Sequence, residues 1–123
     1  MVTVNIRLIA LIEVTSERVL EAELHRLRGE LLQRANDTDL TQAESCFHRA
    51  VEVARRQDAK MFELRATISL ARLLAQQGRR KEAQQMLAEI YNWFTEGFDA
   101  ADLKDAKALL EELRGTEDEP NMQ

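Results

Sequence analysis

The residue types best suited to chemistry in this chain are one cysteine and two histidines. Cys46 and His48 lie two positions apart, whereas His25 lies far from both in the sequence. A cysteine nucleophile needs a neighbouring base, and a zinc site needs three or four ligands at a suitable spacing. Neither pattern occurs, so we interpret Cys46 as a small core-facing or half-buried residue and the histidines as solvated helix residues. The sequence therefore predicts no catalytic, metal-binding or cofactor-binding residue.

Other patterns that would indicate an enzyme are also missing from the sequence. It contains no glycine-rich phosphate loop and no pair of carboxylates that helical periodicity would bury together. Oppositely charged residues do recur four positions apart, as in Glu30 with Arg34, but such pairs are typical of solvated helix faces. We expect a protein without enzymatic activity.

The charge of the chain restricts the partners that it can bind. Its formal net charge is −5, whereas binding to nucleic acid requires concentrated positive charge. A disfavoured alternative, a small nucleic-acid binder, would use Arg49, Arg55, Arg56, Lys60 and Arg65. Because no aromatic side chains that could stack on bases are interleaved with these residues, we expect a protein or peptide partner instead.

Composition and length point to one all-α domain. The 123 residues are 45% hydrophobic and 32% charged, with one proline and four glycines, and this balance favours helices. The single cysteine excludes an internal disulfide bond and favours the cytoplasm. The apolar opening, MVTVNIRLIALIEV, contains Arg7 and is too short to cross a bilayer, so we expect no membrane association.

Residues 62–90 carry the clearest pattern, that of two antiparallel helices joined at Gly78. Apolar residues recur every three or four positions on both sides of this glycine, which predicts one buried stripe on each helix. Gly78 can adopt the left-handed conformation that ends a helix, and the short connection after it favours a hairpin. Ala71 and Ala83 are small residues at which the two helices could approach closely.

This hairpin resembles the tetratricopeptide repeat, in which small residues stand where two helices cross. The residues that carry the resemblance are Leu70, Ala71, Leu74, Gly78, Ala83, Leu87 and Ile90. An earlier copy of the pattern precedes it, because residues 9–24 align with residues 51–66 at an offset of 42. The resemblance implies an all-α, tetratricopeptide-like α-α superhelix of about six antiparallel helices.

The alignment divides the chain into repeats of one domain, which covers residues 1–114. We expect a half hairpin at 1–14, hairpins at 16–57 and 59–95, a capping helix at 100–114 and a disordered acidic tail at 115–123. Residues 2–8 also alternate as a strand would, but the alignment favours the second helix of an incomplete hairpin.

The first complete hairpin has its own start signal and apolar stripe. Thr15 or Ser16 would cap its first helix, and Gly29 would lie at a close contact between helices. The stripe that we expect to be buried consists of Leu20, Leu24, Leu27, Leu31 and Leu32.

A closer resemblance covers nearly the whole chain. The strings EAELHRLRGELL, AESCFHRAVEVARRQ, ELRATISLARL and YNWFTEGFDAADLKDAKALLEEL are similar to the C-terminal helical-repeat region of bacterial adenylate/guanylate cyclase-type signal-transduction ATPases. The resemblance implies a partner-binding or regulatory module, without the cyclase or ATPase reaction. The main alternative is a truncated structural fragment of a larger signalling protein that binds nothing on its own.

The resemblance also implies a partner groove, because the first helix of each tetratricopeptide hairpin lines a concave surface. The residues that it places there are Glu23, Arg26, Glu30, Arg34, Arg65, Ile68, Arg72 and Gln76. Arginine side chains could bind the carboxylates of a peptide or partner domain in this groove. The alternative is that these residues are ordinary solvated charges.

An incomplete first hairpin would leave an apolar helix face uncovered near the N-terminus. The residues on this face are Val2, Ile6 and Ile9. Our hypothesis is that two chains cover the face mutually and form a homodimer through the N-terminal helix.

Overall fold

Five α-helices make up the part of the chain that the computed structural model describes. It describes residues 6–35 and 40–118, with side chains over 20–35 and 40–115. The helices are α1 (Ile6–Ala35), α2 (Thr41–Arg56), α3 (Lys60–Gln76), α4 (Arg80–Tyr91) and α5 (Ala101–Asp118). Since no strand occurs within these ranges, the prediction of an all-α fold is confirmed.

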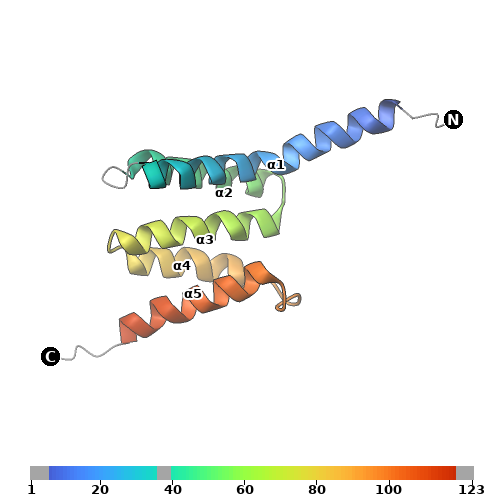
Figure 1. Cartoon of the computed structure of the whole chain (residues 1–123). Coiled ribbons are helices and arrows are strands. Elements are labelled where there is room, and N and C mark those ends of the chain that lie inside the picture. The colour runs from blue at the N-terminus through green and yellow to red at the C-terminus, as the bar shows by residue number, and fades with distance from the viewer. Residues whose placement is uncertain (1–5, 36–39, 119–123) are drawn as a thin grey trace.

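Consecutive helices run antiparallel and stack in two layers (Figure 1). Each helix packs on the next, and α1, α3 and α5 also contact one another in succession. Across the described ranges, no such contact joins α2 to α4. The odd-numbered helices therefore form a continuous layer, with α1 at one end of the stack and α5 at the other.

The main core lies between α3, α4 and α5, and α2 contributes Phe47 to it. Its largest fully buried side chains are Phe47, Leu64, Leu70, Leu73, Leu74, Leu87, Leu103 and Leu113. Ala71 and Ala83, the small residues expected at a close approach of two helices, are both fully buried in this core. Burial of these apolar side chains is the main force that holds the stack together.

Left-handed residues end α2 and α3. Gly78 has φ +82°, and the N–H of Arg79 after it donates to the carbonyl oxygen of Leu74 at 2.8 Å. This geometry satisfies a carbonyl group that the end of a helix would leave unpaired. Asp58 does the same for α2 with φ +57°, although a residue with a Cβ pays a steric cost in that region.

Gly29 allows α1 and α2 to pack closely. A Cβ atom added at this glycine would lie 2.6 Å from Cε1 of Phe47 and 3.1 Å from the carbonyl oxygen of Ala43. Both distances are shorter than ordinary van der Waals contacts, so a larger residue would push the helices apart. Small residues on α1 thus face α2, and Ala22 is buried at 1% exposure in the same way.

Two predicted boundaries are wrong. Thr15 and Ser16 lie inside α1, so residues 6–14 of the expected half hairpin and the first helix of the hairpin at 16–57 form one helix, and the described residues form five helices rather than six. A capping residue stabilises a helix start but does not break a helix that has no glycine or proline there. Helix α5 continues past Gly115 to Asp118, into the expected tail. Residues 119–123 lie outside the described part.

Candidate functional site

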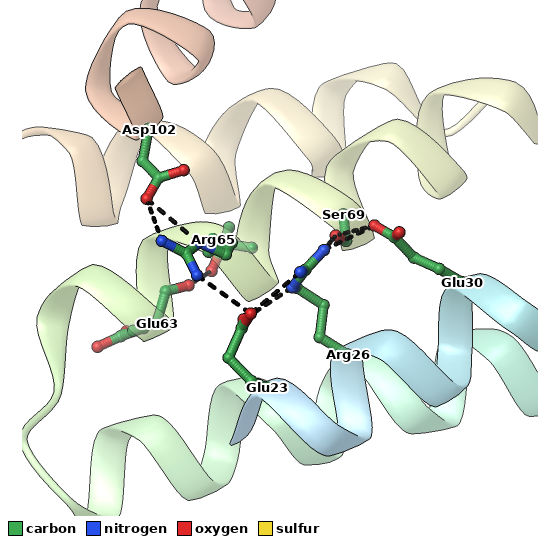
Figure 2. Close-up of polar contacts among 8 residues, drawn as sticks. Glu23, Arg26, Glu30, Glu63, Arg65, Ser69 and Asp102 are labelled. Carbon is green, nitrogen blue, oxygen red and sulfur yellow. Dashed lines mark hydrogen bonds and ion pairs between the residues drawn. The ribbon is translucent and has the colours of Figure 1, made fainter. Parts of the chain in front are cut away.

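An ion-pair network occupies the face shared by α1 and α3, where we expected the partner groove (Figure 2). Arg26 donates two hydrogen bonds to Glu23, from Nε to Oε1 at 2.8 Å and from Nη2 to Oε2 at 3.1 Å. Its Nη1 donates to Oε2 of Glu30, also at 2.8 Å. Ser69 of α3 donates from Oγ to that same oxygen of Glu30 at 3.0 Å. Arg26 is thus held between two carboxylates of its own helix.

Arg65 extends the network across three helices. Its Nη1 donates to Oε2 of Glu23 in α1 at 3.1 Å. Its Nη2 and Nε donate to Oδ2 of Asp102 in α5 at 2.8 and 3.2 Å. Both acceptor side chains are largely shielded from solvent, at 14% and 19% exposure, so water screens these bonds less than it screens surface pairs. One guanidinium in α3 therefore joins all three helices of the odd-numbered layer.

The network shifts the pKa values of Glu23, Arg26 and Arg65. Burial raises the pKa of the Glu23 carboxyl, but hydrogen bonds from Arg26 and Arg65 outweigh burial, so the net pKa is lowered. The hydrogen bond to Glu23 raises the pKa of Arg26, and the hydrogen bond to Asp102 raises the pKa of Arg65. Glu23, Arg26 and Arg65 are therefore charged at neutral pH.

These contacts change the interpretation of the predicted groove. We expected its charged residues to face a partner, but Glu23, Arg26, Glu30 and Arg65 bind one another, and Ile68 is buried at 4% exposure. Helical spacing indicates which side chains share a face, but it does not reveal the partner that each finds on a neighbouring helix. The four charged side chains bind one another at the contact between α1 and α3, and Ile68 belongs to the main core.

The remaining groove residues, Arg34, Arg72 and Gln76, are exposed. Gln76 accepts a hydrogen bond from Nε2 of Gln33 in α1 at 3.1 Å. Arg72 forms no ion pair with any residue in the described part of the chain. A cleft between α3 and α5 is lined by Arg72, Ala75, Gln76, Arg80, Leu109 and Glu112. This cleft is the part of the predicted groove that stays open.

A second surface lies on α1 and is apolar. It consists of Leu20, Leu24, Leu27 and Leu31, which we name the leucine face. Their exposed fractions are 49%, 64%, 45% and 64%, so the prediction that they form a buried stripe is wrong. The reason is that α1 turns its small residues, Ala22 and Gly29, toward α2, and none of the described helices packs on its opposite side. Of the predicted stripe, Leu32 alone packs against the main core.

The proposed N-terminal dimer face cannot be placed on the surface. Val2 lies outside the described residues. Ile6 and Ile9 belong to α1, but their side chains are likewise outside the described part.

The cysteine and histidines are separate from both surfaces. Cys46 is half-buried, and Nε2 of His48 lies 3.3 Å from Oε2 of Glu44 on the same helix. His25 lies 4.0 Å from Glu21. Over the described ranges, no three His, Cys, Asp or Glu side chains are grouped closely enough to hold a metal ion. None of the described helices is both long enough and apolar enough to cross a membrane.

Comparisons with known proteins leave the description at the level of architecture. No protein-family model matches the chain, and no curated protein and no solved structure matches it. The fold and the surfaces define the class, an all-α stack of antiparallel helices whose first helix carries a line of exposed leucines.

Proposed function

We propose that this chain is a non-enzymatic protein-interaction or regulatory module that docks a helical segment of a partner on its leucine face. The observation that carries the proposal is the exposure of four leucines in one line, between 45% and 64% each. Single exposed leucines are normal, but a contiguous apolar patch usually marks an interaction site. Hydrophobic burial would supply most of the binding free energy.

The spacing of the leucine face favours a helix as the docked element. Leu20, Leu24, Leu27 and Leu31 follow one another at steps of four, three and four residues. This alternation keeps side chains on one narrow line along an α-helix, and it is typical of the seam between two packed helices. A partner helix with a similar apolar stripe would fit between these side chains.

The architecture supports a tetratricopeptide-like superhelix as the scaffold. Odd-numbered helices contact one another in succession, whereas α2 and α4 make no such contact within the described ranges. The regulatory role follows the sequence resemblance to the C-terminal region of cyclase-type signal-transduction ATPases. A cytoplasmic location fits a chain with one cysteine.

The cleft between α3 and α5 is a second candidate surface, and an acidic peptide is the ligand that it favours. Arg72 is exposed and has no ion pair within the described part of the chain, so its five N–H donors are available to a carboxylate. Arg80 and Gln76 add further donors beside it.

Affinity purification with matched variants tests the leucine face. The double substitution Leu24→Glu with Leu27→Glu places two charges on the face, and Ala101→Glu with Ala108→Glu adds the same charges at exposed positions of α5. We expect wild type and the α5 variant to retain the same partners, which include further copies of the chain, and the leucine variant to lose them. Identical recovery by all three proteins would contradict the proposal and favour the structural-fragment alternative.

A parallel comparison tests the cleft. Arg72→Glu reverses the charge of the cleft, whereas Arg49→Glu reverses an exposed arginine of α2 that pairs with Glu52 at 3.1 Å. We expect Arg72→Glu alone to weaken binding of an acidic peptide library by about tenfold or more. Equal binding by both variants would remove the cleft from consideration.

A further inference from the structure

We infer that the leucine face binds a second copy of this chain, with the two α1 helices antiparallel across a two-fold axis. The inference rests on the proposed function, because it names the partner of the same surface. It follows from the repeat, from the polarity of the two ends of the stack, and from the spacing and charge of α1.

The leucine face is a stacking face that lacks a neighbour. The equivalent positions of α3, 42 residues later, are Phe62, Ala66, Ser69 and Leu73. Phe62 packs against residues of α1 and α2, and Ser69 hydrogen-bonds to Glu30 of α1. Ala66 and Leu73 are fully buried. These positions of the repeat are therefore built to receive a helix, and those of α1 receive none from the described part of the chain.

The opposite end of the stack cannot cover this face. The exposed residues of α5 between 101 and 114 are Ala101, Lys104, Asp105, Lys107, Ala108, Glu111, Glu112 and Arg114. This surface is charged, and burying it against leucines would cost its hydration. A head-to-tail contact is thus disfavoured. Two copies that meet through the same leucine face form a closed two-fold dimer.

The spacing of the leucines matches itself under a two-fold rotation. The steps of four, three and four residues read the same in both directions along the helix. A two-fold axis between His25 and Arg26 places Leu24 opposite Leu27 of the second copy. The same axis places Leu20 opposite Leu31 of the second copy. All four leucines of each chain are then paired in one antiparallel seam.

In the same arrangement, opposite charges on one side of the leucine seam would pair between the two chains. Glu21 and Arg28 lie two helical turns apart on one side of α1. The Glu21 side chain is 45% exposed, and Arg28 is exposed without an ion pair to any residue that the structure describes. Antiparallel pairing brings the same flank of both helices together with their directions reversed. Each Glu21 then faces Arg28 of the second copy, so the dimer gains two ion pairs.

Sedimentation velocity from about 5 to about 500 µM tests the dimer. We expect wild-type protein to pass from the monomer mass of 14.1 kDa to twice that mass, with a dissociation constant on the order of 10 µM because the face is smaller than a standard interface. Leu24→Glu with Leu27→Glu should weaken the dimer at least about 100-fold. Ala101→Glu with Ala108→Glu should leave it unchanged. A wild-type chain that stays at the monomer mass at every concentration would overturn the inference.

Charge reversal tests the antiparallel geometry itself. Glu21→Arg alone places arginine opposite arginine, and Arg28→Glu alone places glutamate opposite glutamate, so each variant should associate about tenfold more weakly. Mixing the two variants restores both opposite-charge pairs, and a heterodimer at least as tight as the wild-type dimer should form. If the mixture associates no better than either variant alone, the antiparallel arrangement is wrong.

The outcomes separate this inference from the proposed function. If the wild-type chain stays monomeric, but Leu24→Glu with Leu27→Glu abolishes binding of another protein, the self-pairing is wrong and the proposed docking face is retained. A chain that neither dimerises nor loses a partner through that double substitution would overturn both. Circular dichroism of each variant checks folding, which should be unaffected because the substituted leucines are at least 45% exposed.

Discussion

Glu23 and Arg65 stand 42 residues apart in the sequence, yet Oε2 of Glu23 lies 3.1 Å from Nη1 of Arg65. The separation equals the offset at which the chain aligns with itself, so α1 and α3 pack in the register of the internal repeat. Side chains at equivalent positions of the repeat therefore join the equivalent helices α1 and α3.

Replacing Arg65 should destabilise the stack more than replacing an exposed arginine. Arg65→Ala removes hydrogen bonds to Glu23 and Asp102 and leaves two shielded carboxylates without this partner. We expect a loss of about 2 kcal/mol in the free energy of unfolding, measured by urea denaturation. Arg49→Ala removes an exposed pair with Glu52 and should cost less than about 0.5 kcal/mol. Equal losses would show that the network contributes no more than surface charge.

Stability should fall on acidification through Glu23. The pKa of its carboxyl is lowered from the ordinary 4.5 in the folded chain, so its contribution is complete above that ordinary value and is lost as pH falls toward the lowered one. The pKa values of Arg26 and Arg65 are raised above their ordinary value, so their contributions change only at strongly alkaline pH.

Glu23→Gln should therefore flatten the dependence of unfolding free energy on pH between about 6 and about 3. The measurement is a series of urea titrations across that range. Glu52→Gln is the control, because Glu52 is 60% exposed and its variant should follow the wild-type slope. A Glu23→Gln curve parallel to wild type would contradict the role of this carboxyl.

Gly29→Ala should destabilise the chain although alanine is the better helix former. The added Cβ would meet the ring of Phe47, which is fully buried and cannot move away easily. We expect a net loss of about 1 kcal/mol, since an overpacking cost of about 1–3 kcal/mol is offset in part by a propensity gain of about 1 kcal/mol.

Gly115→Ala provides the matched control, because a Cβ there meets no described atom within 4 Å. This variant should be as stable as wild type or slightly more stable by thermal unfolding. In a Phe47→Leu background, the cost of Gly29→Ala should shrink, because the ring that clashes is gone. An unchanged cost in that background would place the clash elsewhere.

Gly78 should tolerate asparagine better than alanine. Its φ of +82° lies in the left-handed region, and a Cβ at this position has open space around it. The cost of Gly78→Ala is therefore conformational, about 1 kcal/mol in the free energy of unfolding. Asparagine visits this region more readily, so Gly78→Asn should cost less when both are measured in the same urea series. The reverse order would contradict this explanation.

Sequence reasoning was accurate where a helix has neighbours on both sides. Helices α3 and α4 flank Gly78, and Ala71 and Ala83 are buried between them, because periodicity, small residues and a left-handed turn all indicate the same hairpin. All three signals are local, so they can be read from a single chain.

The same reasoning was inaccurate at the end of the stack. Periodicity identified the leucines of α1 as one face, but it did not reveal that Ala22 and Gly29, on the other face, meet α2. The repeat alignment contained the missing signal, because the positions equivalent to the leucines lie on the side of α3 that faces the preceding helices. Long side chains such as Arg26 and Arg65 can contact residues on several neighbouring helices, and the spacing within one helix does not predict which residue they bind.

Arg65 touches both the first and the last helix of the described stack. In most helical-repeat proteins each repeat contacts only its immediate neighbours, so the two terminal repeats unfold locally and independently of each other. Here the guanidinium of Arg65 binds both terminal helices, so local unfolding of one terminal helix should weaken a contact that stabilises the other. Amide hydrogens near both ends should consequently exchange with solvent in a single concerted event.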